Sequence, residues 1–514
     1  MMKTEAKKKT VLKSSQVGEL LGQDLIHILT EIHRNIGETP YLTGGTVRDL
    51  VMNRKPADID LTVREDAKGW ASKLVRMTGG TYVALGRDED AARVVWQGRD
   101  IDFSSYRDGA VTIDEELTKR DITVNSMAVS LKALLCSNDV PLENQALEVV
   151  DPVGGLDDIV NQQIRVTSGL SFTSDPLRLL RVFRFAATLG FLIHGKTLDL
   201  VALQKEWISR SAPERVSYEL NLIMGSGRAH RTLKELADTG LLFEIIPELK
   251  SGVGMEQPSS HHLDVFDHCL ATLEYMEKVQ KDPDVYFPQQ REIMERYLAT
   301  GRHRTQLKWA ALFHDLGKPS TVAINEDKGG RITFYNHDRE GMVLVGEIAR
   351  RLRWSSENTH AVGSLVGFHM RPFFLGNDMR QGKLSLKACL RLIRLVGAVM
   401  PGLFLLSMAD ALAGKGENRP EKIELEVAEL FERLEKVRKE NVEPVRTSPP
   451  LLNGKDLIEV LNLKPGPLFK ELLDFLEEAH MENIISSRRE ALAMARDYLN
   501  AGKEEAVLTQ DNKK

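Results

Sequence analysis

The stretch YLTGGTVRDLVMNRKPADIDLTV, residues 41–63, decides the fold of the first part of the chain. Its two ends predict strands, and the segment that begins at the Gly-Gly pair predicts a short helix between them. Asp58 and Asp60 flank Ile59, so both carboxylates point to the same face of an extended strand. Two acids held that close repel each other unless cations surround them. On its own, the pair also allows a solvated edge strand with two surface acids.

The composition sets the outer limits. A chain of 514 residues is too long for one hydrophobic core, and we expect about three or four domains. A net charge of −5 gives no global sign of nucleic-acid binding, so a polyanionic partner would need a local basic surface. The cysteines Cys136, Cys269 and Cys389 lie far apart, which favours a reducing, cytoplasmic compartment without disulfides. We find no apolar run of membrane-spanning length and no signal peptide, so no membrane partner is predicted.

The pattern along the chain changes once. Strand-like segments at 81–86, 91–98 and 99–107 follow the opening stretch, and from Thr118 onward the pattern is helical. This predicts a multidomain α+β protein, with an N-terminal α/β head on a mixed or antiparallel sheet followed by all-helical domains. The predicted segments are a basic, flexible N-terminus (1–24), the head (25–150), a helical neck (151–250), a histidine-rich helical domain (251–414), a charged helix and linker (415–447), a small helical unit (448–502) and a flexible C-terminus (503–514).

The head carries the residue types that nucleotide transfer from a triphosphate requires. That reaction uses two divalent cations held by carboxylates on a rigid element. Asp58 and Asp60 meet this need, and Asp102 in RDIDFSSYR offers a third carboxylate from a neighbouring strand. Gly44 and Gly45 let the backbone approach phosphates at a strand-to-helix turn, where amides and the helix dipole favour an anion. The combination predicts a catalytic site at Asp58, Asp60 and Asp102.

GGTVRD…ADIDLT resembles the signature of class II tRNA nucleotidyltransferases and bacterial poly(A) polymerases, within the polymerase-β nucleotidyltransferase superfamily. Four more motifs of that family follow in order: KRDITVN (119–125), DPVGGLDDI (151–159), SDPLR (174–178) and RVSYE (215–219). Three of them depart from the family pattern, with Lys119 for Arg, Ile159 for Leu and Ser174 for Glu. The resemblance implies transfer to the 3′ acceptor end of tRNA, with two Mg²⁺ ions held by Asp58 and Asp60.

The resemblance also implies a set of nucleotide-binding residues: Gly44, Gly45, Arg48, Arg120, Asp121, Asn125, Asp175, Arg178, Arg181, Arg184 and Arg215. Asp175 and Arg178 are implied to read the incoming base in place of a template. A carboxylate accepts from an exocyclic amino group and a guanidinium donates to a neighbouring acceptor, so cytosine and adenine fit, whereas uracil and guanine do not. For Arg181 and Arg184, a solvated helix face is the alternative to contact with the triphosphate or the RNA end.

The spacing between two motifs bears on which nucleotides are added. Eighteen residues, FSSYRDGAVTIDEELTKR, separate Asp102 from Asp121. Family members that complete CCA carry a flexible loop here, which re-orients the reader residues from C to A, and a shortened loop is typical of CC-adding enzymes. We therefore predict addition of CC from CTP, beside a separate A-adding enzyme. The alternatives are full CCA addition from CTP and ATP, and A-only or poly(A) addition. An ordinary surface deletion is the alternative explanation of the short loop.

Histidines recur through the middle of the chain. His314 and Asp315 are adjacent on an apolar helix, and burying such a pair without partners is costly. Histidine and carboxylate ligands from separate helices suit a first-row divalent metal. The segment resembles an HD phosphohydrolase domain, whose ligand pattern is matched by His268, His314, Asp315 and Asp410, with His337 and His369 where binuclear members add ligands. The resemblance implies an ion such as Mn²⁺, Ni²⁺ or Fe²⁺ and attack of an activated water on phosphorus.

Two alternatives concern the helical part of the chain, and two more concern the whole chain. The HD domain could bind metal yet be catalytically idle, as a structural body for the RNA. Residues 451–499 resemble the family's body or tail, in which SSRRE (486–490) is either a phosphate-binding surface or a solvated helix face. For the whole chain, the rival predictions are a phosphohydrolase with a non-catalytic RNA-binding head, and a non-catalytic RNA-binding protein.

Overall fold

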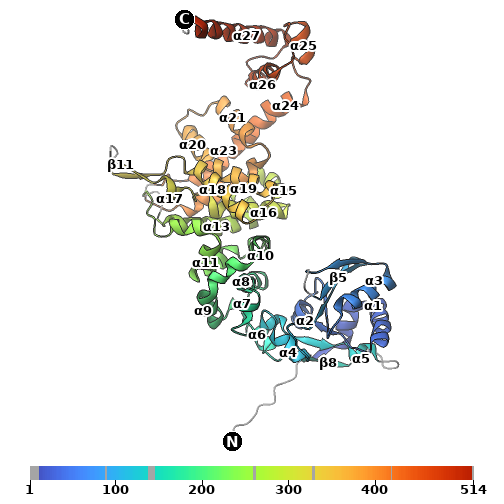
Figure 1. The fold of residues 1–514 in the computed structure, drawn as a ribbon. Helices are drawn as coiled ribbons and strands as arrows, with labels where there is room; N and C mark the ends of the chain where they lie inside the picture. The colour runs from blue at the N-terminus through green and yellow to red at the C-terminus, as the bar shows by residue number, and fades with distance from the viewer. Residues whose placement is uncertain are drawn as a thin grey trace. The chain divides into compact units, whose positions relative to one another are not determined.

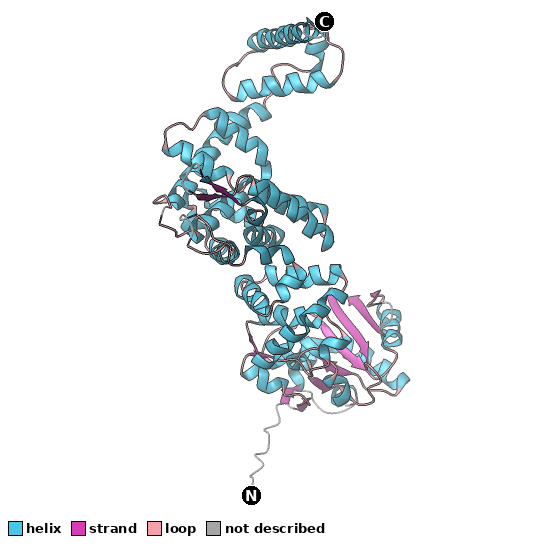
Figure 2. Ribbon diagram, turned by 60° about the vertical axis from the view of Figure 1, so that its left-hand side comes forward, coloured by secondary structure: helices cyan, strands magenta, loops and turns pink. Residues whose placement is uncertain are grey.

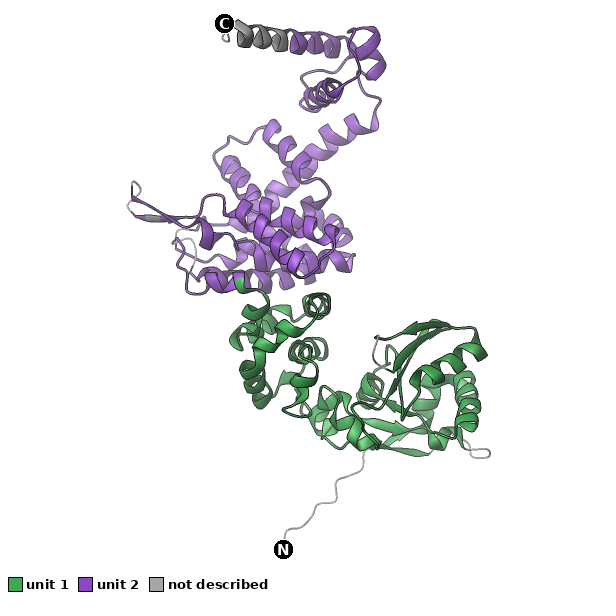
Figure 3. Cartoon of the chain, in the orientation of Figure 1, with its two compact units in different colours: residues 1–247 green, residues 248–514 purple. Residues whose placement is uncertain are grey.

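The computed structural model describes residues 11–86, 90–136, 145–258, 262–326, 330–417 and 419–511, with Arg331 and residues 501–511 described by their backbone alone. The chain forms two compact units, residues 1–247 and 248–514 (Figure 3). Most of the strands belong to the first unit, and the described part of the second is helical apart from one small hairpin (Figure 2). The predicted multidomain α+β architecture is confirmed.

An eight-stranded mixed sheet forms the head, in the order β1-β8-β7-β2-β3-β6-β5-β4. Its strands are β1 (Val11–Lys13), β2 (Tyr41–Thr43), β3 (Ile59–Val63), β4 (Thr81–Ala84), β5 (Ala91–Trp96), β6 (Arg99–Ser105), β7 (Ala128–Ser130) and β8 (Ala146–Val150). β3 and β6 pair in parallel, and the other described neighbours are antiparallel. This parallel pair sets Asp60 directly opposite Asp102.

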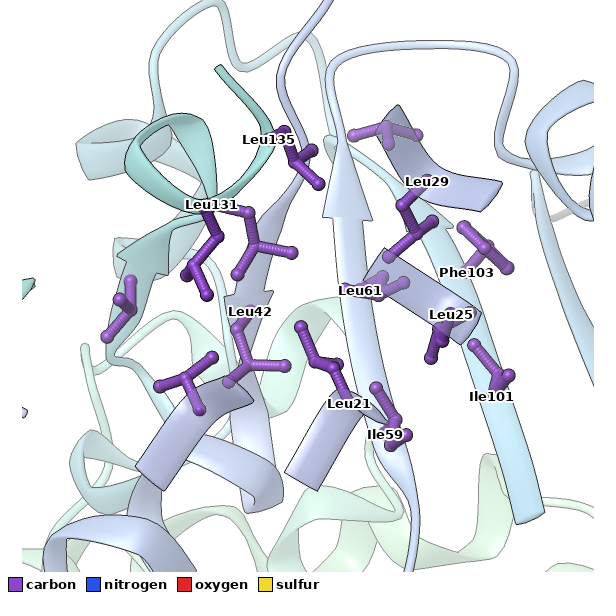
Figure 4. Close-up of a cluster of buried hydrophobic side chains, with 14 of the residues drawn as sticks. Leu21, Leu25, Leu29, Leu42, Ile59, Leu61, Ile101, Phe103, Leu131 and Leu135 are labelled. Atoms are coloured by element: carbon purple, nitrogen blue, oxygen red, sulfur yellow. The ribbon is translucent and has the colours of Figure 1, made fainter. Parts of the chain in front are cut away.

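One face of the sheet, the one that does not carry Asp60 and Asp102, is apolar. Helices α1 (Ser14–Ile36) and α3 (Ala67–Thr78) cover it. Leu21, Leu25 and Leu29 recur every four residues, so they line one side of α1. They belong to the same fully buried cluster as Leu61 and Phe103 (Figure 4). Strand alternation then leaves Asp60 and Asp102 on the face that α1 and α3 do not cover.

Residues 11–24, predicted to belong to a flexible N-terminus, are ordered instead. β1 pairs with β8, and α1 begins at Ser14. Leu12, Val17 and Leu21 are buried in the head core. The prediction was wrong here because the basic run obscured the apolar positions after it, which the sheet edge and core bury. Residues 1–10 lie outside the described part of the chain.

The rest of the first unit is mainly helical (Figure 1). Its helices are α2 (Gly44–Val51), α4 (Ile113–Thr118), α5 (Lys132–Leu135), α6 (Gly155–Val160), α7 (Ser171–Ser174), α8 (Arg178–Leu189), α9 (Gly195–Gln204), α10 (Pro213–Gly225), α11 (Ala229–Asp238) and α12 (Leu241–Ile245). The predicted neck also contains a short parallel ladder of β9 (Gln163–Ile164) and β10 (Leu192–Ile193).

The second unit packs α13, α16, α19 and α22 together at its centre. Its elements are α13 (Val265–Lys281), α14 (Pro283–Tyr286), α15 (Arg291–Leu298), α16 (Gly301–Phe313), α17 (Lys318–Thr321), β11 (Ala323–Asn325), β12 (Arg331–Thr333), α18 (His337–Arg351), α19 (Ser356–Phe368), α20 (Arg371–Arg380), α21 (Leu386–Val396), α22 (Met400–Ala413), α23 (Ile423–Val437), α24 (Glu443–Thr447), α25 (Gly454–Glu459), α26 (Pro467–Met481) and α27 (Arg488–Asp511). The small unit predicted at 448–502 has its own apolar cluster, which includes Leu457, Leu472 and Ala491. The side chains of the predicted flexible C-terminus, 503–514, lie outside the described residues.

One helical stretch departs from the membrane prediction. By length and composition, Leu386–Ala413 could cross a membrane, and it is the one such stretch in the part of the chain that the structure describes. However, 67% of the most apolar window is buried inside the protein, and α22 carries the buried Asp410. Burial of this extent is typical of a core helix.

Candidate active and metal sites

The three predicted catalytic carboxylates come together in the head. One oxygen each from Asp58, Asp60 and Asp102 lies within 4.8 Å of the other two. Asp60 and Asp102 face each other on β3 and β6, and Asp58 immediately precedes β3. Strand alternation predicted that Asp58 and Asp60 share a face, and the parallel pairing of β3 with β6 adds Asp102.

The cluster is electrostatically strained without cations. Burial, and then the charges of Asp60 and Asp102, raise the pKa of Asp58 to about 6. Burial also raises the pKa of Asp60, although Arg120 and a hydrogen bond from Thr46 oppose it. Oxygen ligands with surplus negative charge are what Mg²⁺ prefers, so these residues fit the implied ions.

In the absence of metal, the protein is expected to become less stable as the pH rises through about 6, since folded Asp58 holds its proton more tightly than unfolded Asp58. This contribution is fully present below the usual carboxyl pKa and amounts to about 1 kcal/mol after allowance for partial exposure. Scanning calorimetry of metal-free protein should show a smaller fall in Tm between about pH 5 and about pH 7 for Asp58→Asn than for the wild type. An equal fall would contradict this assignment.

The turn from β2 into α2 is built around Asp60. Gly44 has a φ of +65°, and a Cβ there would lie 2.7 Å from Asp60 Oδ2. The backbone N–H and the hydroxyl of Thr46 each donate to that same oxygen over 3.3 Å. A Cβ on Gly45 would meet only ordinary contacts, the nearest being 3.4 Å from Arg48. The structure thus gives a steric reason for glycine at position 44, where a side chain would collide with Asp60. The approach of a phosphate to Gly45 stays a prediction.

Gly44→Ala is expected to lower nucleotide incorporation by about tenfold or more, because the added Cβ displaces the Asp60 carboxylate and strains the backbone. Gly37→Ala is the matched control, since Gly37 has a φ of +79° but nothing within 4 Å of its Cβ position. Both variants should lose stability to a similar extent in thermal melts, and only Gly44→Ala should lose activity. Equal activity losses would show that backbone strain alone is responsible.

Two of the predicted nucleotide-binding arginines have different surroundings. Arg48 donates to Asn125 Oδ1 at 2.7 Å and pairs with its neighbour Asp49. Arg120 is only 7% exposed and donates to the hydroxyls of Thr43 and Thr62. Arg120 is thus a buried counter-ion of Asp60, whose raised pKa it opposes, and of Glu116, which lies 3.3 Å away. Arg48 is instead linked to the buried Asn125.

A chain of ion pairs ties the third motif to the neck. Arg181 on α8 donates to Asp121 Oδ2 from Nε and Nη2, at 2.9 and 2.6 Å. Glu219 on α10 lies 3.5 Å from Arg181 and accepts from Arg184 at 2.9 Å. Burial opposes it, but Arg181 and Arg178 hold the pKa of Asp121 well below its usual range. Arg181 and Arg184 are therefore not merely solvated side chains. Their contact with the triphosphate or the RNA end stays a prediction.

The predicted base readers lie at the start of α8. Arg215 donates to Asp175 Oδ2 over 3.0 Å, and Asp175 Oδ1 accepts from the N–H of Leu177. Arg178 is directed onto Ser171, whose hydroxyl lies 3.1 Å from its Nη1. The second residue of SDPLR and the first residue of RVSYE are therefore linked by one ion pair, which orients the Asp175 carboxylate.

In the second unit, the six predicted ligands converge from different helices. They are His268 on α13, His314 and Asp315 after α16, His337 at the start of α18, His369 after α19, and Asp410 on α22. They form two groups, one of His268, His314 and Asp410 and the other of Asp315, His337 and His369, each with its ligand atoms within 4.8 Å. Asp315 lies between the groups, with Oδ2 3.2 Å from His314 Nε2 and Oδ1 3.4 Å from His337 Nε2.

Hydrogen bonds fix the tautomers of three of these histidines. The Nδ1 atoms of His314, His337 and His369 lie 2.9, 2.7 and 2.7 Å from backbone carbonyls, to which each N–H donates. In the neutral form of each ring, its Nε2 atom then carries a lone pair. Nε2 of His314 has no hydrogen-bond partner among the described residues, and those of His337 and His369 face each other at 3.2 Å. Two lone pairs directed at one another need a shared proton or a metal cation, and the second of these makes the residues fit a divalent metal.

The protonation of His369 and Asp315 agrees with that interpretation, whereas His314 differs. Burial opposes it, but Asp315 and Asp410 raise the pKa of His314 well above its usual value, so without a metal this ring holds a proton. Burial, and then His337 and His314, lower the pKa of His369 to about 4. Burial opposes it, but the histidines and Lys318 hold the pKa of Asp315 well below its usual range. A neutral imidazole and an ionised carboxylate are the ligand forms, so an ion that binds here would displace the proton of His314.

A cavity of about 740 Å³ opens onto this cluster and reaches Asp315, His337 and Asp410. Lys318, Arg339 and Arg371 supply positive charge along it. Its apolar wall is aromatic and includes Phe334, Tyr335, Phe373 and Phe374. The cavity is larger than a phosphate group needs, and its lining suits an organic phosphate.

Some functional side chains were missed by sequence reasoning. Arg93 on β5 contacts the head carboxylates, and Thr46 positions Asp60. Thr46 follows the Gly-Gly pair directly and could have been recognised as a helix-start hydroxyl. Arg93 depends on the pairing of β5 with β6, which no local pattern reveals. Arg488, part of the predicted basic surface, is engaged with Asp456 at 2.6 Å.

Known protein families match the chain in the same order as these sites. Three family models match the chain: "Poly A polymerase head domain" over 40–165, "Probable RNA and SrmB- binding site of polymerase A" over 190–252, and "HD domain" over 265–396. The A-adding tRNA nucleotidyltransferase of Deinococcus radiodurans is 30% identical over 462 residues, covering 89% of this chain and 95% of the relative. The CC-adding tRNA nucleotidyltransferase of Thermus thermophilus is 29% identical over 466 residues, covering 90% and 94%.

Solved structures share the fold. A CCA-adding enzyme in complex with ATP superposes with a TM-score of 0.63 at 19% identity, covering 95% of this chain and 97% of that one. The Thermotoga maritima CCA-adding enzyme complexed with tRNA gives 0.59 at 18% identity, covering 95% and 98%.

Proposed function

The chain belongs to the tRNA nucleotidyltransferase family with a poly(A) polymerase head, and on that premise we propose that it adds two cytidines to the 3′ acceptor end of tRNA. The substrates are CTP and tRNA, without a nucleic-acid template. A separate A-adding enzyme then supplies the last nucleotide, and both act in the cytoplasm.

The observation that carries the CC proposal is the segment between Asp102 and Asp121. This segment contains α4 and is held by hydrogen bonds between its own residues. The N–H of Arg107 donates to the Glu116 carboxylate at 2.7 Å. Lys119 donates to the carbonyl of Asp108, also at 2.7 Å. With eighteen residues held in this way, little chain remains for a mobile loop that could re-orient the readers from C to A. The A-adding and CC-adding relatives are almost equally similar, so the family alone does not choose between them.

The head residues divide the reaction among them. Asp58, Asp60 and Asp102 would hold two Mg²⁺ ions, which when bound neutralise the triphosphate and activate the attacking hydroxyl. The amides at the start of α2 face an anion favourably, and the Gly44 turn keeps Asp60 against them. The donor and acceptor residues of the reader pair then select the base.

Selection follows from hydrogen-bond chemistry. Asp175 accepts from the exocyclic amino group of cytosine, and Arg178 donates to the acceptor beside it. Arg215 already holds one oxygen of Asp175, so the carboxylate is oriented before the nucleotide arrives. Uracil would place a carbonyl oxygen against a carboxylate oxygen of Asp175. Both atoms are acceptors and no proton lies between them, so uracil is rejected.

The test is extension of a tRNA that lacks its last three nucleotides, resolved to single nucleotides, with Mg²⁺ and CTP, ATP or both. Two added cytidines, with no third step when ATP is present, support the proposal. Addition of a final A after two cytidines would make the protein a full CCA enzyme. Addition of A only, to a tRNA that already ends in CC, would make it an A-adding enzyme, and long ATP-dependent tails a poly(A) polymerase.

We propose a second activity, metal-dependent hydrolysis of a phosphate ester, for the HD cluster. The cavity that joins the ligands to Lys318, Arg339 and Arg371 favours it over a structural body for RNA. Lys318 Nζ lies 2.5 Å from Asp315 Oδ2 and 2.6 Å from Gln257 Oε1, beside the ligand cluster. Mono- and di-p-nitrophenyl phosphate should be hydrolysed with Mn²⁺ or Ni²⁺ and not with EDTA. Failure with every first-row metal would favour the structural alternative.

A further inference from the structure

Arg93 occupies an unusual position in the head. It lies on β5 directly opposite Asp102 on β6, in the register of the antiparallel pair. Its Nε and Nη2 donate to the two oxygens of Asp102 at 2.7 and 2.8 Å, and its Nη1 donates to Asp100 at 2.9 Å. Nη2 also lies 3.8 Å from Asp58. One guanidinium therefore contacts two members of the carboxylate cluster and one acid outside it.

This contact and a divalent ion at Asp102 oppose each other. A bidentate arginine occupies one in-plane lone pair on each carboxylate oxygen. A dication bound to the same carboxylate would lie within a few ångströms of the guanidinium, where the repulsion of like charges is large. Because the Arg93 side chain is 32% exposed, it has room to move. Asp100, which is outside the metal-binding group, already accepts from it.

We propose that Arg93 is a positioning residue and the resident counter-ion of the head site. It holds Asp102 in place while no nucleotide is bound, and it transfers fully to Asp100 when divalent ions take Asp102. The inference rests on the proposed nucleotidyl transfer, since that reaction is what requires Asp102 as a ligand. Arg93 thereby sets how readily the head binds metal before the triphosphate arrives.

The test is titration of the nucleotide-free full chain with Mn²⁺, followed by the electron paramagnetic resonance signal of the free ion. The background carries His314→Gln and Asp315→Asn, so that binding reports on the head. Arg93→Met is expected to bind Mn²⁺ about tenfold more tightly, because Asp102 is released. Arg93→Lys keeps the charge but not the two-pronged contact, and we expect an increase of about threefold. Arg76→Met, which removes an exposed arginine on α3, should leave the affinity unchanged.

Two comparisons can overturn the proposal. If Arg93→Lys binds like the wild type, Arg93 acts only through its charge, and unchanged or weaker binding by Arg93→Met would exclude any competition. Asp100→Asn should weaken Mn²⁺ binding by about threefold in the wild type and have no effect beside Arg93→Met. An equal effect in both backgrounds would exclude the transfer to Asp100. The extension assay fails or succeeds independently of these affinities, so it separates an error about Arg93 from an error about the proposed function.

Discussion

Asp60→Asn is expected to lower cytidine incorporation by about 10³-fold or more, because the reaction depends on anionic ligands for divalent ions. The amide keeps the shape of the side chain and can still accept from Thr46, so the turn at Gly44 should survive. Loss of charge, and not loss of fold, is then what the variant measures. Single-turnover incorporation of labelled CTP onto tRNA lacking its CCA end provides the rate.

Asp114→Asn is the matched control, since Asp114 is an exposed carboxylate on α4 of the same unit. It should keep its rate within about twofold. Hydrolysis at the HD cluster should be unaffected by either substitution. A rate for Asp60→Asn within tenfold of the wild type would show that Asp60 does not hold a catalytic ion, and would favour the phosphohydrolase with a non-catalytic head.

The double substitution His314→Gln, Asp315→Asn is expected to remove the transition metal and to reduce phosphate-ester hydrolysis by about 10²-fold or more. It removes one ligand from each of the two groups, and Asp315 is the residue that lies between them. The new amides can still bond their neighbours, including Lys318, which limits structural damage. Metal content by mass spectrometry and hydrolysis of p-nitrophenyl phosphate are the two measurements.

His360→Gln is the control, because His360 is an exposed histidine on α19 and outside the cluster. It should retain both metal and hydrolysis. Nucleotide incorporation should stay within about twofold of the wild type in the double variant, since the head carries its own ligands. Full metal content in the double variant would contradict the assignment of these six residues as ligands.

The head was largely predictable because its candidate catalytic residues lie in short, local sequence patterns. Alternation places Asp58 and Asp60 on one face of β3, and the apolar residues between and after them on the other. Asp102 followed from the same reasoning on β6. The parallel pairing of β3 with β6 could not be deduced from spacing, yet it is what brings Asp102 opposite Asp60.

Long-range partners account for what the sequence did not reveal. The stripe of arginines on α8 left open whether Arg181 was solvated, since Asp121 lies far away in the sequence and Glu219 is on another helix. Arg93 was missed for the same reason, because its contact with Asp102 depends on strand register. Residues 11–24 were assigned to the tail because they follow the basic run of residues 1–10, although burial is decided by a few apolar positions.

The Nδ1–H to carbonyl bonds of His314, His337 and His369 have a kinetic consequence. These rings are already oriented by the backbone, so an ion can leave or enter without rotation of its ligands or refolding of the helices. Exchange should then be limited by diffusion through the cavity and by dehydration of the ion. A site that loads in this way equilibrates with the ion supply, and the metal it carries is set by which ion is abundant around the protein.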